Sequence, residues 1–450
     1  MHLVVGSGVL VLVGTLMAWR SNRNWLSPPL ITLGVLLLFY GGAIVYFCTT
    51  GHALTPFYVA VGVLFYGCGA LLGARLKDFK PVSELESFSS APFVSMFPVR
   101  RVFVVTLWTV GLLSIIDGAL YFCRAGVPLL TEWSSLARTE AISGGGLYLR
   151  SLSTFLPMSV LVAFLYRKYH KTRSSTLLIS VLLTASGVFL ILYGSRGAAI
   201  NYVVPLLFVL GVLHKRKASG KAIMLIAVFL LAGLTLQSSY SGYRDLPAAD
   251  TVGVFAGRLT TQQVEALDYF VYDVIPLRGF YLGEVHGNGL RGILGLFRII
   301  PYEPPFGEIL FRMKAGGQVS AGFTLVTTSL GDLYADFGLI GICVGMFVYG
   351  VIAQVLYIRL LRSRKDYFWL AVLCYFQFVV LCAHIGGEVF GVLADKGASL
   401  AALVLLMIFL YSVLCLPTGA VTIASPRRLK RPGFSDGTDR DANSGQRAGI

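Results

Sequence analysis

Two carboxylates stand four residues apart in the stretch TTSLGDLYADFGLIG, which covers residues 327–341. Asp332 and Asp336 would share one face if this stretch is helical, because residues four apart lie above one another on a helix. Such a pair can accept a proton, orient a hydroxyl group or hold an arginine. We therefore take Asp332 as a candidate catalytic residue, with pairing to an arginine as the alternative.

Two histidines lie in glycine-containing segments, His286 in EVHGNG and His384 in AHIGGE. An imidazole titrates near neutral pH, so either one is a candidate general base. The alternative is a structural histidine held by hydrogen bonds. We place His286 with Asp332 among the candidate catalytic residues.

A third candidate is Arg196 in the segment YGSRG, between two apolar stretches. Charge in a short turn between membrane helices is costly unless it has a partner. The neighbouring glycines would let the backbone turn and bring the guanidinium close to a ligand. A residue that only extends its charge to the membrane surface is the alternative.

The elements that position these residues must be membrane helices. The chain has 450 residues, of which 56% are hydrophobic and 13% charged, which is too apolar for a water-soluble globule. A spanning helix needs about 20 apolar residues. We predict an all-α polytopic protein with about eleven transmembrane helices, at 3–19, 29–49, 54–74, 102–123, 150–166, 175–193, 197–213, 222–237, 337–358, 368–386 and 397–416.

Basic residues predict the orientation, because Lys and Arg stay on the cytoplasmic side of short loops. They cluster after every second predicted span and in the tail, for example Arg75 and Lys77 after the third and Arg362 and Lys365 after the ninth. We therefore predict that the N-terminus is outside and the C-terminus in the cytoplasm of a plasma (inner) membrane protein. The net charge of +15 is explained by this bias, so no nucleic acid partner is expected.

A smaller set of basic residues falls on the predicted outer side: Arg124, Arg138, Arg150, Arg196, Arg244, Arg258, Arg278, Arg291, Arg298, Arg312, Lys314 and Lys396. The arginine side chain binds two phosphate or carboxylate oxygens at once and keeps its charge when partly buried. The set predicts an anion site that faces outwards. Pairing with the acids of the same side, or with lipid headgroups, is the alternative.

The predicted organisation is a bundle at 1–237, a large extracytoplasmic loop at 238–336, three further helices at 337–416 and a disordered cytoplasmic tail at 417–450. The loop is too long to be structureless. Apolar residues at spacings of three and four predict a helix at 261–275, and GLRGILGLFRII at 289–300 is typical of a helix in the membrane interface. The seven cysteines predict neither a disulfide framework nor a zinc site, and we expect no metal or cofactor.

The outer segments resemble a known family. GVPLLTEWSSLARTEAISGGG at 126–146, GSRG at 194–197 and TSLGDLYADFGLIG at 328–341 follow one another as in the O-antigen polymerases (Wzy type), the oligosaccharide repeat-unit polymerases. The resemblance lies in the order of the segments more than in any single motif. It implies a fold similar to the O-antigen ligases and to lipid-carrier glycosyltransferases with membrane-embedded sites.

The resemblance implies polymerisation of oligosaccharide repeat units carried on undecaprenyl pyrophosphate, without a metal or nucleotide. By motif, the family's anion-binding arginines correspond to Arg138 and Arg196; by position alone, Arg244, Arg258 and Arg298 are added. Asp332 departs from the family, where Glu is common at this place. Implied partners are membrane lipids and a chain-length regulator protein. A ligase reaction and a transporter or flippase are the alternatives.

Overall fold

The computed structural model describes residues 2–127, 150–193, 196–213, 253, 256–257, 260–296, 299–301, 304–316 and 325–416. All the regular elements in these ranges are helices. The predicted span at 222–237 and the predicted tail at 417–450 lie outside the described residues. The all-helical class is therefore confirmed for the part of the chain that the structure describes.

In the part of the chain that the structure describes, eight helices are long and apolar enough to cross a membrane, and they coincide with eight of the predicted spans. This set confirms a polytopic membrane protein, while the count of eleven spans stays a prediction. The eight are α1 (His2–Asn22), α2 (Pro28–Thr50), α3 (Leu54–Leu76), α5 (Arg100–Ala125), α9 (Arg173–Tyr193), α17 (Thr328–Arg362), α18 (Tyr367–Gly386) and α19 (Val389–Cys415).

Two other predicted spans form shorter helices. The first is a π-helical turn, η2 (Ser151–Phe155), that continues into α8 (Leu156–Tyr169), and the second is α10 (Arg196–Leu213). A further helix that the sequence did not predict, α4 (Pro81–Ser90), carries Glu84, which pairs with Arg362 at the end of α17 at 2.7 Å. This contact joins the α3–α5 connection to the end of α17.

The long loop contains the helices that its periodicity predicted. The predicted helix at 261–275 is α13 (Thr261–Tyr269), the π-helical turn η3 (Phe270–Val274) and α14 (Ile275–Arg278). The predicted interfacial helix begins five residues earlier than expected, as α15 (Glu284–Leu296), so the EVHGNG segment is helical. A helix that the sequence missed, α16 (Phe306–Lys314), follows Pro304 and Pro305.

Close packing at glycine holds α1, α3 and α17 together. A methyl group at Gly67 of α3 would overlap the backbone of Gly14 in α1, and one at Gly350 of α17 would overlap the backbone of Tyr66 in α3. Small residues allow membrane helices to approach closely, where dispersion contacts replace the hydrophobic drive. These three helices therefore form a firm support for the loop helices that rest on them.

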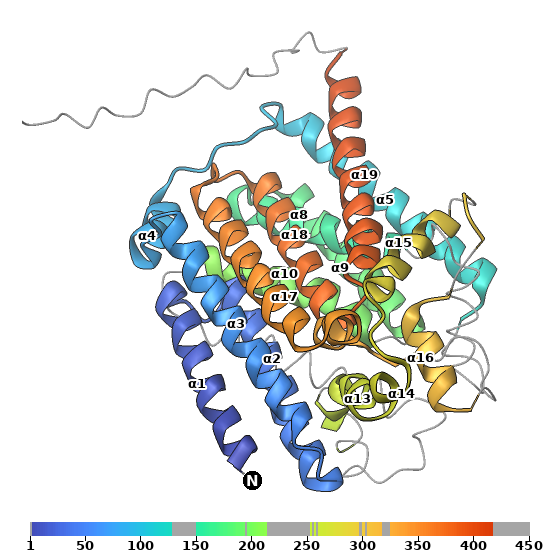
Figure 1. Cartoon of the computed structure of the whole chain (residues 1–450). Helices are drawn as coiled ribbons and strands as arrows, with labels where there is room; N and C mark the ends of the chain where they lie inside the picture. Colours follow the sequence, from blue (N-terminus) through green and yellow to red (C-terminus); the bar gives the residue numbers. More distant parts are fainter. Residues whose placement is uncertain are drawn as a thin grey trace, which may run out of the picture.

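The α2–α3 turn, α13, α14 and α16 lie at one end of the bundle, which we call the loop end, and the N-terminus of α1 lies there too (Figure 1). Helix α4 lies at the opposite end (Figure 1). The first and third helices thus both run away from the loop end, as the alternating charge pattern requires.

The predicted starts of two spans are wrong. We expected the ninth span to begin at residue 337, but α17 begins at Thr328 and breaks at Gly338, where φ is 63° and ψ is −148°. Hydropathy missed the first part because it is polar, yet its polar side chains are buried against protein. We call residues 328–337 the half-helix of α17. Similarly, α19 begins at Val389, so Asp395 and Lys396 lie within a helix and not in an outer loop.

Candidate functional site

The half-helix of α17 brings both predicted carboxylates into the protein interior. Asp332 and Asp336 are each 0% exposed. A buried carboxylate is costly unless it accepts hydrogen bonds or becomes neutral. The donors to each of these two side chains therefore indicate what it holds in place.

Asp336 forms an ion pair with His286 and caps the beginning of α15. Its Oδ2 lies 2.5 Å from Nδ1 of His286. The backbone N–H groups of Val285 and His286 also donate to this carboxylate, each at 3.1 Å. The sequence suggested an arginine partner for these acids, but the ion-pair partner among the described residues is a histidine.

The contact with Asp336 fixes the orientation of the His286 imidazole. Because the Asp336 carboxylate accepts from Nδ1, the other ring nitrogen, Nε2, is the one left for a ligand. The His286 side chain is 13% exposed, whereas Asp336 is fully buried. A base oriented by a buried carboxylate is the arrangement that activates hydroxyl groups in many enzymes.

The charges around His286 raise its affinity for a proton. Burial by itself lowers the pKa of His286, but the hydrogen bond to Asp336 and the negative charges of Asp332 and Asp336 outweigh burial and raise it above the ordinary value. A base with a pKa moved upwards takes a proton more readily at neutral pH.

Asp332, one helical turn away, has a different set of partners. Its Oδ2 accepts the backbone N–H of Glu388 at 2.5 Å. Glu388 adopts a left-handed conformation, with φ of 48°. The preceding residue must be glycine, because φ is 68° there and a methyl group at Gly387 would overlap the hydroxyl of Thr327. Asp332 therefore holds the turn between α18 and α19 against the half-helix.

The held turn directs the Glu388 carboxylate at α16. Its Oε1 accepts the N–H of Gly307 at 3.4 Å, at the N-terminus of that helix. Burial raises the pKa of Glu388, against the hydrogen bonds from Phe306 and Gly307. A carboxylate at a helix N-terminus satisfies free N–H groups and the helix dipole. Sequence reasoning missed Glu388; its signal is the GGE segment, in which two glycines allow the tight turn.

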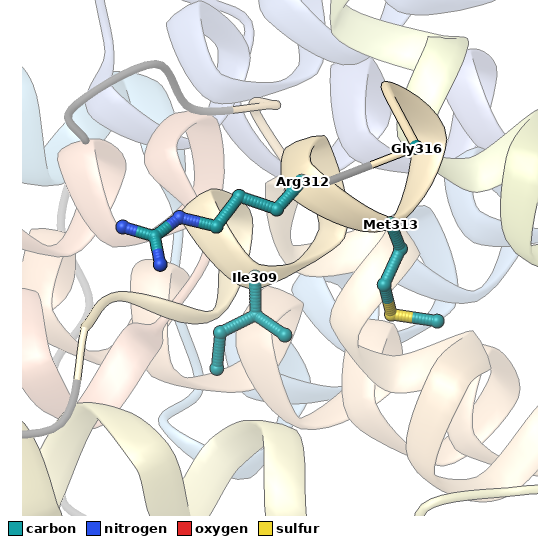
Figure 2. Close-up of a pocket in the computed structure, with 4 residues that line it drawn as sticks. All are labelled: Ile309, Arg312, Met313 and Gly316. Carbon is teal, nitrogen blue, oxygen red and sulfur yellow. The ribbon is translucent and has the colours of Figure 1, made fainter. Parts of the chain in front are cut away.

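Helix α16 carries the cavity shown in Figure 2. Its volume is about 450 Å³, and it is lined by Ile309, Arg312, Met313 and Gly316. The guanidinium of Arg312 pairs with Glu308 at 2.5 Å. This cavity thus belongs to a helix whose N-terminus Glu388 caps.

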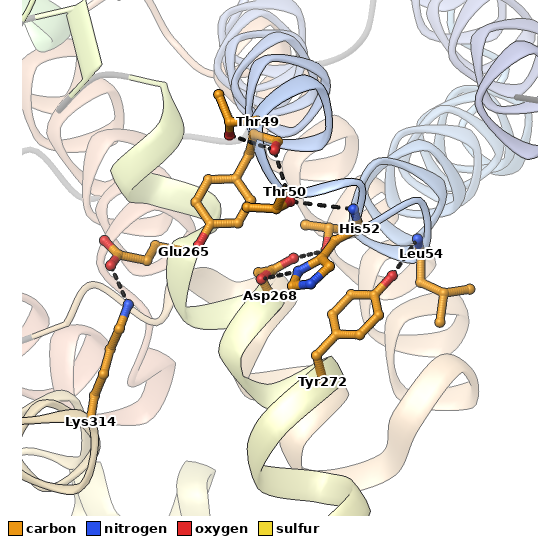
Figure 3. A network of polar contacts seen from close by, with 10 residues as sticks. Thr49, Thr50, His52, Leu54, Glu265, Asp268, Tyr272 and Lys314 are labelled. Carbon is orange, nitrogen blue, oxygen red and sulfur yellow. Dashed lines mark hydrogen bonds and ion pairs between the residues drawn. The ribbon is translucent and has the colours of Figure 1, made fainter. Parts of the chain in front are cut away.

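A second histidine–aspartate pair joins the long loop to the α2–α3 turn (Figure 3). Nδ1 of His52 lies 2.8 Å from Oδ2 of Asp268, and the hydroxyl of Thr55 donates to Oδ1 at 2.5 Å. The His52 ring stacks on Tyr272, with centroids 3.9 Å apart. Nearby, Lys314 pairs with Glu265. Together these contacts attach α13 and α16 to the membrane helices.

The predicted anion-binding arginines are placed only in part. Arg138, Arg244, Arg258 and Arg298 lie outside the described residues. Arg196 is the first residue of α10, and its side chain is not among those described. Of the predicted site residues, the structure brings His286 and Asp332 near each other: His286 pairs with Asp336, which lies one helical turn after Asp332. The roles of the arginines stay predictions.

Among the other predicted outer cations, several are paired with acids of the same side. Besides Arg312 and Lys314, Arg150 contacts Asp395 at 2.7 Å. Lys396 instead donates to the side-chain oxygen of Asn201 at 3.1 Å. Pairing with acids, the alternative that the sequence left open, thus applies to Arg150, Arg312 and Lys314.

His384 has a structural environment. It is 2% exposed, and its Nδ1 lies 2.9 Å from the hydroxyl of Ser329 in the half-helix. A fully enclosed imidazole cannot reach a substrate from solvent or lipid. Of the two predicted histidines, His286 is therefore the better candidate for a general base.

Comparison of the chain with protein-family models, with curated proteins and with solved structures finds no match. Any function must therefore be argued from the chain's own residues. Those residues offer an oriented, partly accessible imidazole beside the break in a membrane helix. Such a group can remove a proton from a hydroxyl that attacks an electrophile, which is the demand of acyl, phosphoryl or glycosyl transfer.

Proposed function

We propose that the chain is a glycosyltransferase that polymerises oligosaccharide repeat units carried on undecaprenyl pyrophosphate, at the outer face of the plasma membrane. The observation that carries the proposal is the His286–Asp336 pair, in which a buried carboxylate orients a partly exposed imidazole at 2.5 Å. The order of the outer segments, which resembles that of the Wzy-type polymerases, supplies the reaction class.

In the proposed reaction, an acceptor hydroxyl of one lipid-linked unit attacks the anomeric carbon of the growing chain. A new carbon–oxygen bond forms as the bond to the pyrophosphate breaks, and Nε2 of His286 takes the hydroxyl proton. The pyrophosphate is already a good leaving group, so the protein has to orient the acceptor and stabilise the departing charge. The anion site would consist of Arg138, Arg196, Arg244, Arg258 and Arg298.

Asp332 has a positioning role in this proposal. A carboxylate that is 0% exposed and bonded to the backbone of Glu388 does not touch a substrate. It keeps the α18–α19 turn against the half-helix that carries Asp336. The catalytic group is then His286, with Asp336 as the residue that orients it.

Direct displacement predicts inversion at the anomeric carbon, without a metal or cofactor. The anomeric linkage in the polymer should therefore be opposite to that in the lipid-linked unit, as measured by NMR of both species. Retention of configuration would exclude the single-displacement reaction.

A genetic experiment tests the function itself. Deletion of the gene should abolish the long ladder of surface polysaccharide on a gel and leave single-unit species, and the wild-type gene should restore the ladder while Arg196→Ala should not. An unchanged ladder in the deletion strain would refute the polymerase. A ligase would instead transfer preformed chains to another acceptor, such as a lipid core. Deletion of a flippase would leave the units on the cytoplasmic face.

The orientation is part of the proposal and has its own test. With the N-terminus outside and the C-terminus in the cytoplasm, a topology reporter fused after residue 280 must be active outside and one fused after residue 218 inside. The opposite pattern would place His286 in the cytoplasm, where an outer-leaflet polymerase cannot work.

A further inference from the structure

A tight loop, which we define as residues 277–282 and which includes the end of α14, lies over the break in α17. The N–H groups of Tyr281 and Leu282 donate to the carbonyls of Ala335 and Asp336, at 3.0 and 3.2 Å. These carbonyls end the half-helix, and a helix end buried without such partners would be unstable. The Phe280 ring covers Gly338, where a methyl group would lie 2.9 Å from the ring. The loop is therefore fixed at the level of the break.

This loop exposes large apolar side chains. Leu277 is 90% exposed, Leu282 is 79% exposed and Phe280 is 48% exposed. Leu282 also has a φ of 51°, a left-handed conformation that costs on the order of 1 kcal/mol or more for a leucine. Strain that exposes a leucine to water would be doubly unfavourable, so the loop requires an apolar environment.

The same apolar surface continues along α17. Just past the break, Ile340 is 74% exposed, Val344 is 59% exposed and Val348 is 45% exposed. Residues four apart form one stripe on a helix, and this stripe belongs to a membrane-spanning segment. The loop extends a surface that already faces lipid.

The contacts of α3 with α1 and α17 show the level of the break along α1. The break lies further from the loop end than the outermost exposed apolar residues of α1. Gly62 of α3 contacts Leu330 and Ile342, on the two sides of the break, and Gly14 of α1 packs between Val63 and Gly67 of α3. Because α1 and α3 run in the same direction, the level of the break corresponds to about residue 11 of α1, at ~1.5 Å per residue.

Exposed apolar residues of α1 continue beyond that level towards the loop end. Val9 is 58% exposed and Val5 is 66% exposed, and they lie roughly 3 and 9 Å past the level of the break. A hydrocarbon layer that covers Val5 and Val9 also reaches the loop over the break.

We propose that the loop at 277–282 inserts into the acyl-chain region of the bilayer leaflet at the loop end, with Leu277, Phe280 and Leu282 in contact with lipid. Arg278 fits this depth, because its guanidinium lies 5.0 Å from the centre of the Tyr281 ring and its stem can extend the charge to the headgroups. Arg and Tyr side chains are typical of this boundary.

The insertion sets the depth of His286, which follows the loop by one helical turn. It places the imidazole beside Asp336, at the level of the break in α17 and of the lipid acyl chains. The inference does not depend on the proposed reaction. It needs only that the loop and α17 meet the same bilayer.

Tryptophan fluorescence in proteoliposomes tests the proposal. Leu277→Trp changes a side chain that is 90% exposed, so the fold should not be affected. The matched control is Thr49→Trp, at an exposed position near the end of α2, about 10 Å further towards the loop end. The wild-type emission, which comes from 5 native tryptophans, is subtracted from each variant.

Phospholipids with bromine at the middle of the acyl chain should remove most of the emission added by Leu277→Trp and little of that added by Thr49→Trp. Leu282→Trp, at the other end of the loop, should behave as Leu277→Trp does. Quenching by aqueous iodide instead would show that the loop is in water. Resistance to both quenchers would show a protein cover, such as residues 214–250 or a second copy. Either result, or equal quenching of Leu277→Trp and Thr49→Trp, would overturn the proposal.

Discussion

The described residues contain two histidine–aspartate pairs, one at the loop end and one beside the break in α17, and they differ in what the aspartate holds. Asp268 accepts from the side chains of His52 and Thr55, so it joins two segments through side chains alone. Asp336 accepts from the His286 ring and from two backbone N–H groups at the start of α15. The first pair therefore acts as a tether between segments, and the second fixes one imidazole in a single orientation.

The environment of the two histidines differs as well. The His52 side chain is 35% exposed, and its ring stacks on Tyr272. The His286 side chain is 13% exposed and stands beside a break in a membrane helix. Similar pairs can thus serve attachment or chemistry, and the surroundings of the aspartate distinguish the two.

The largest expected effect is on transfer activity. His286→Ala removes the proposed proton acceptor, and loss of general base catalysis should slow polymer formation by about 10²–10⁴-fold. The measurement is transfer between lipid-linked repeat units in proteoliposomes. Glu284→Gln, in the first turn of the same helix, is the matched control and should retain activity. Full activity of a folded His286→Ala protein would exclude the histidine as the base.

The next effect is on stability. Asp336→Ala leaves two N–H groups and an imidazole without their buried acceptor, which should cost about 3–5 kcal/mol of unfolding free energy. Thermal unfolding in detergent measures it. A double-mutant cycle with His286→Ala should give a larger coupling energy than the equivalent cycle of Asp268→Ala with His52→Ala. Equal couplings would remove the distinction between the two pairs.

A third effect is the pH dependence of stability. The folded-state pKa of His286 is raised above its ordinary value by Asp336 and Asp332, despite burial. The ion pair therefore stabilises the fold fully below the unfolded-state pKa of about 6.5, and this contribution is lost as pH rises through the raised pKa.

Unfolding midpoints should be measured from below about pH 6.5 to above the raised pKa of His286. They should fall with rising pH in the wild type and less steeply in His286→Gln. Transfer activity should move the opposite way, because the base must be unprotonated. The same slope in both proteins would assign the pH dependence to another group.

Sequence periodicity predicted most of the fold because a membrane selects long apolar stretches. It also found the loop helix at 261–275, since Val264, Leu267 and Val271 repeat with the helical spacing. It failed at the half-helix of α17, where Asp332 and Asp336 lower the hydropathy although both are buried. Hydropathy records what a side chain prefers in isolation, and these carboxylates are stabilised by donors from distant segments.

The candidate site shows the same limit. His286 and Asp332 were recognised by residue type, but the pairing of His286 with Asp336 joins positions 50 residues apart. Glu388 comes from a third segment, 81 residues from its partner Gly307. No local spacing encodes such contacts, because they depend on how α15, α16 and the α18–α19 turn pack on the break in α17.

The smallest expected effect comes from the tether. His52→Gln keeps an amide that can donate to Asp268, and Thr55 and the Lys314–Glu265 pair still attach the loop. Because His52 is about one third exposed, solvent screens the pair, and its loss should cost only about 0–1 kcal/mol. The unfolding midpoint and the transfer rate should both stay near the wild-type values. A loss of transfer as large as that of His286→Ala, with the fold intact, would move the chemistry to His52 and Asp268 and make the pair at α15 the structural one.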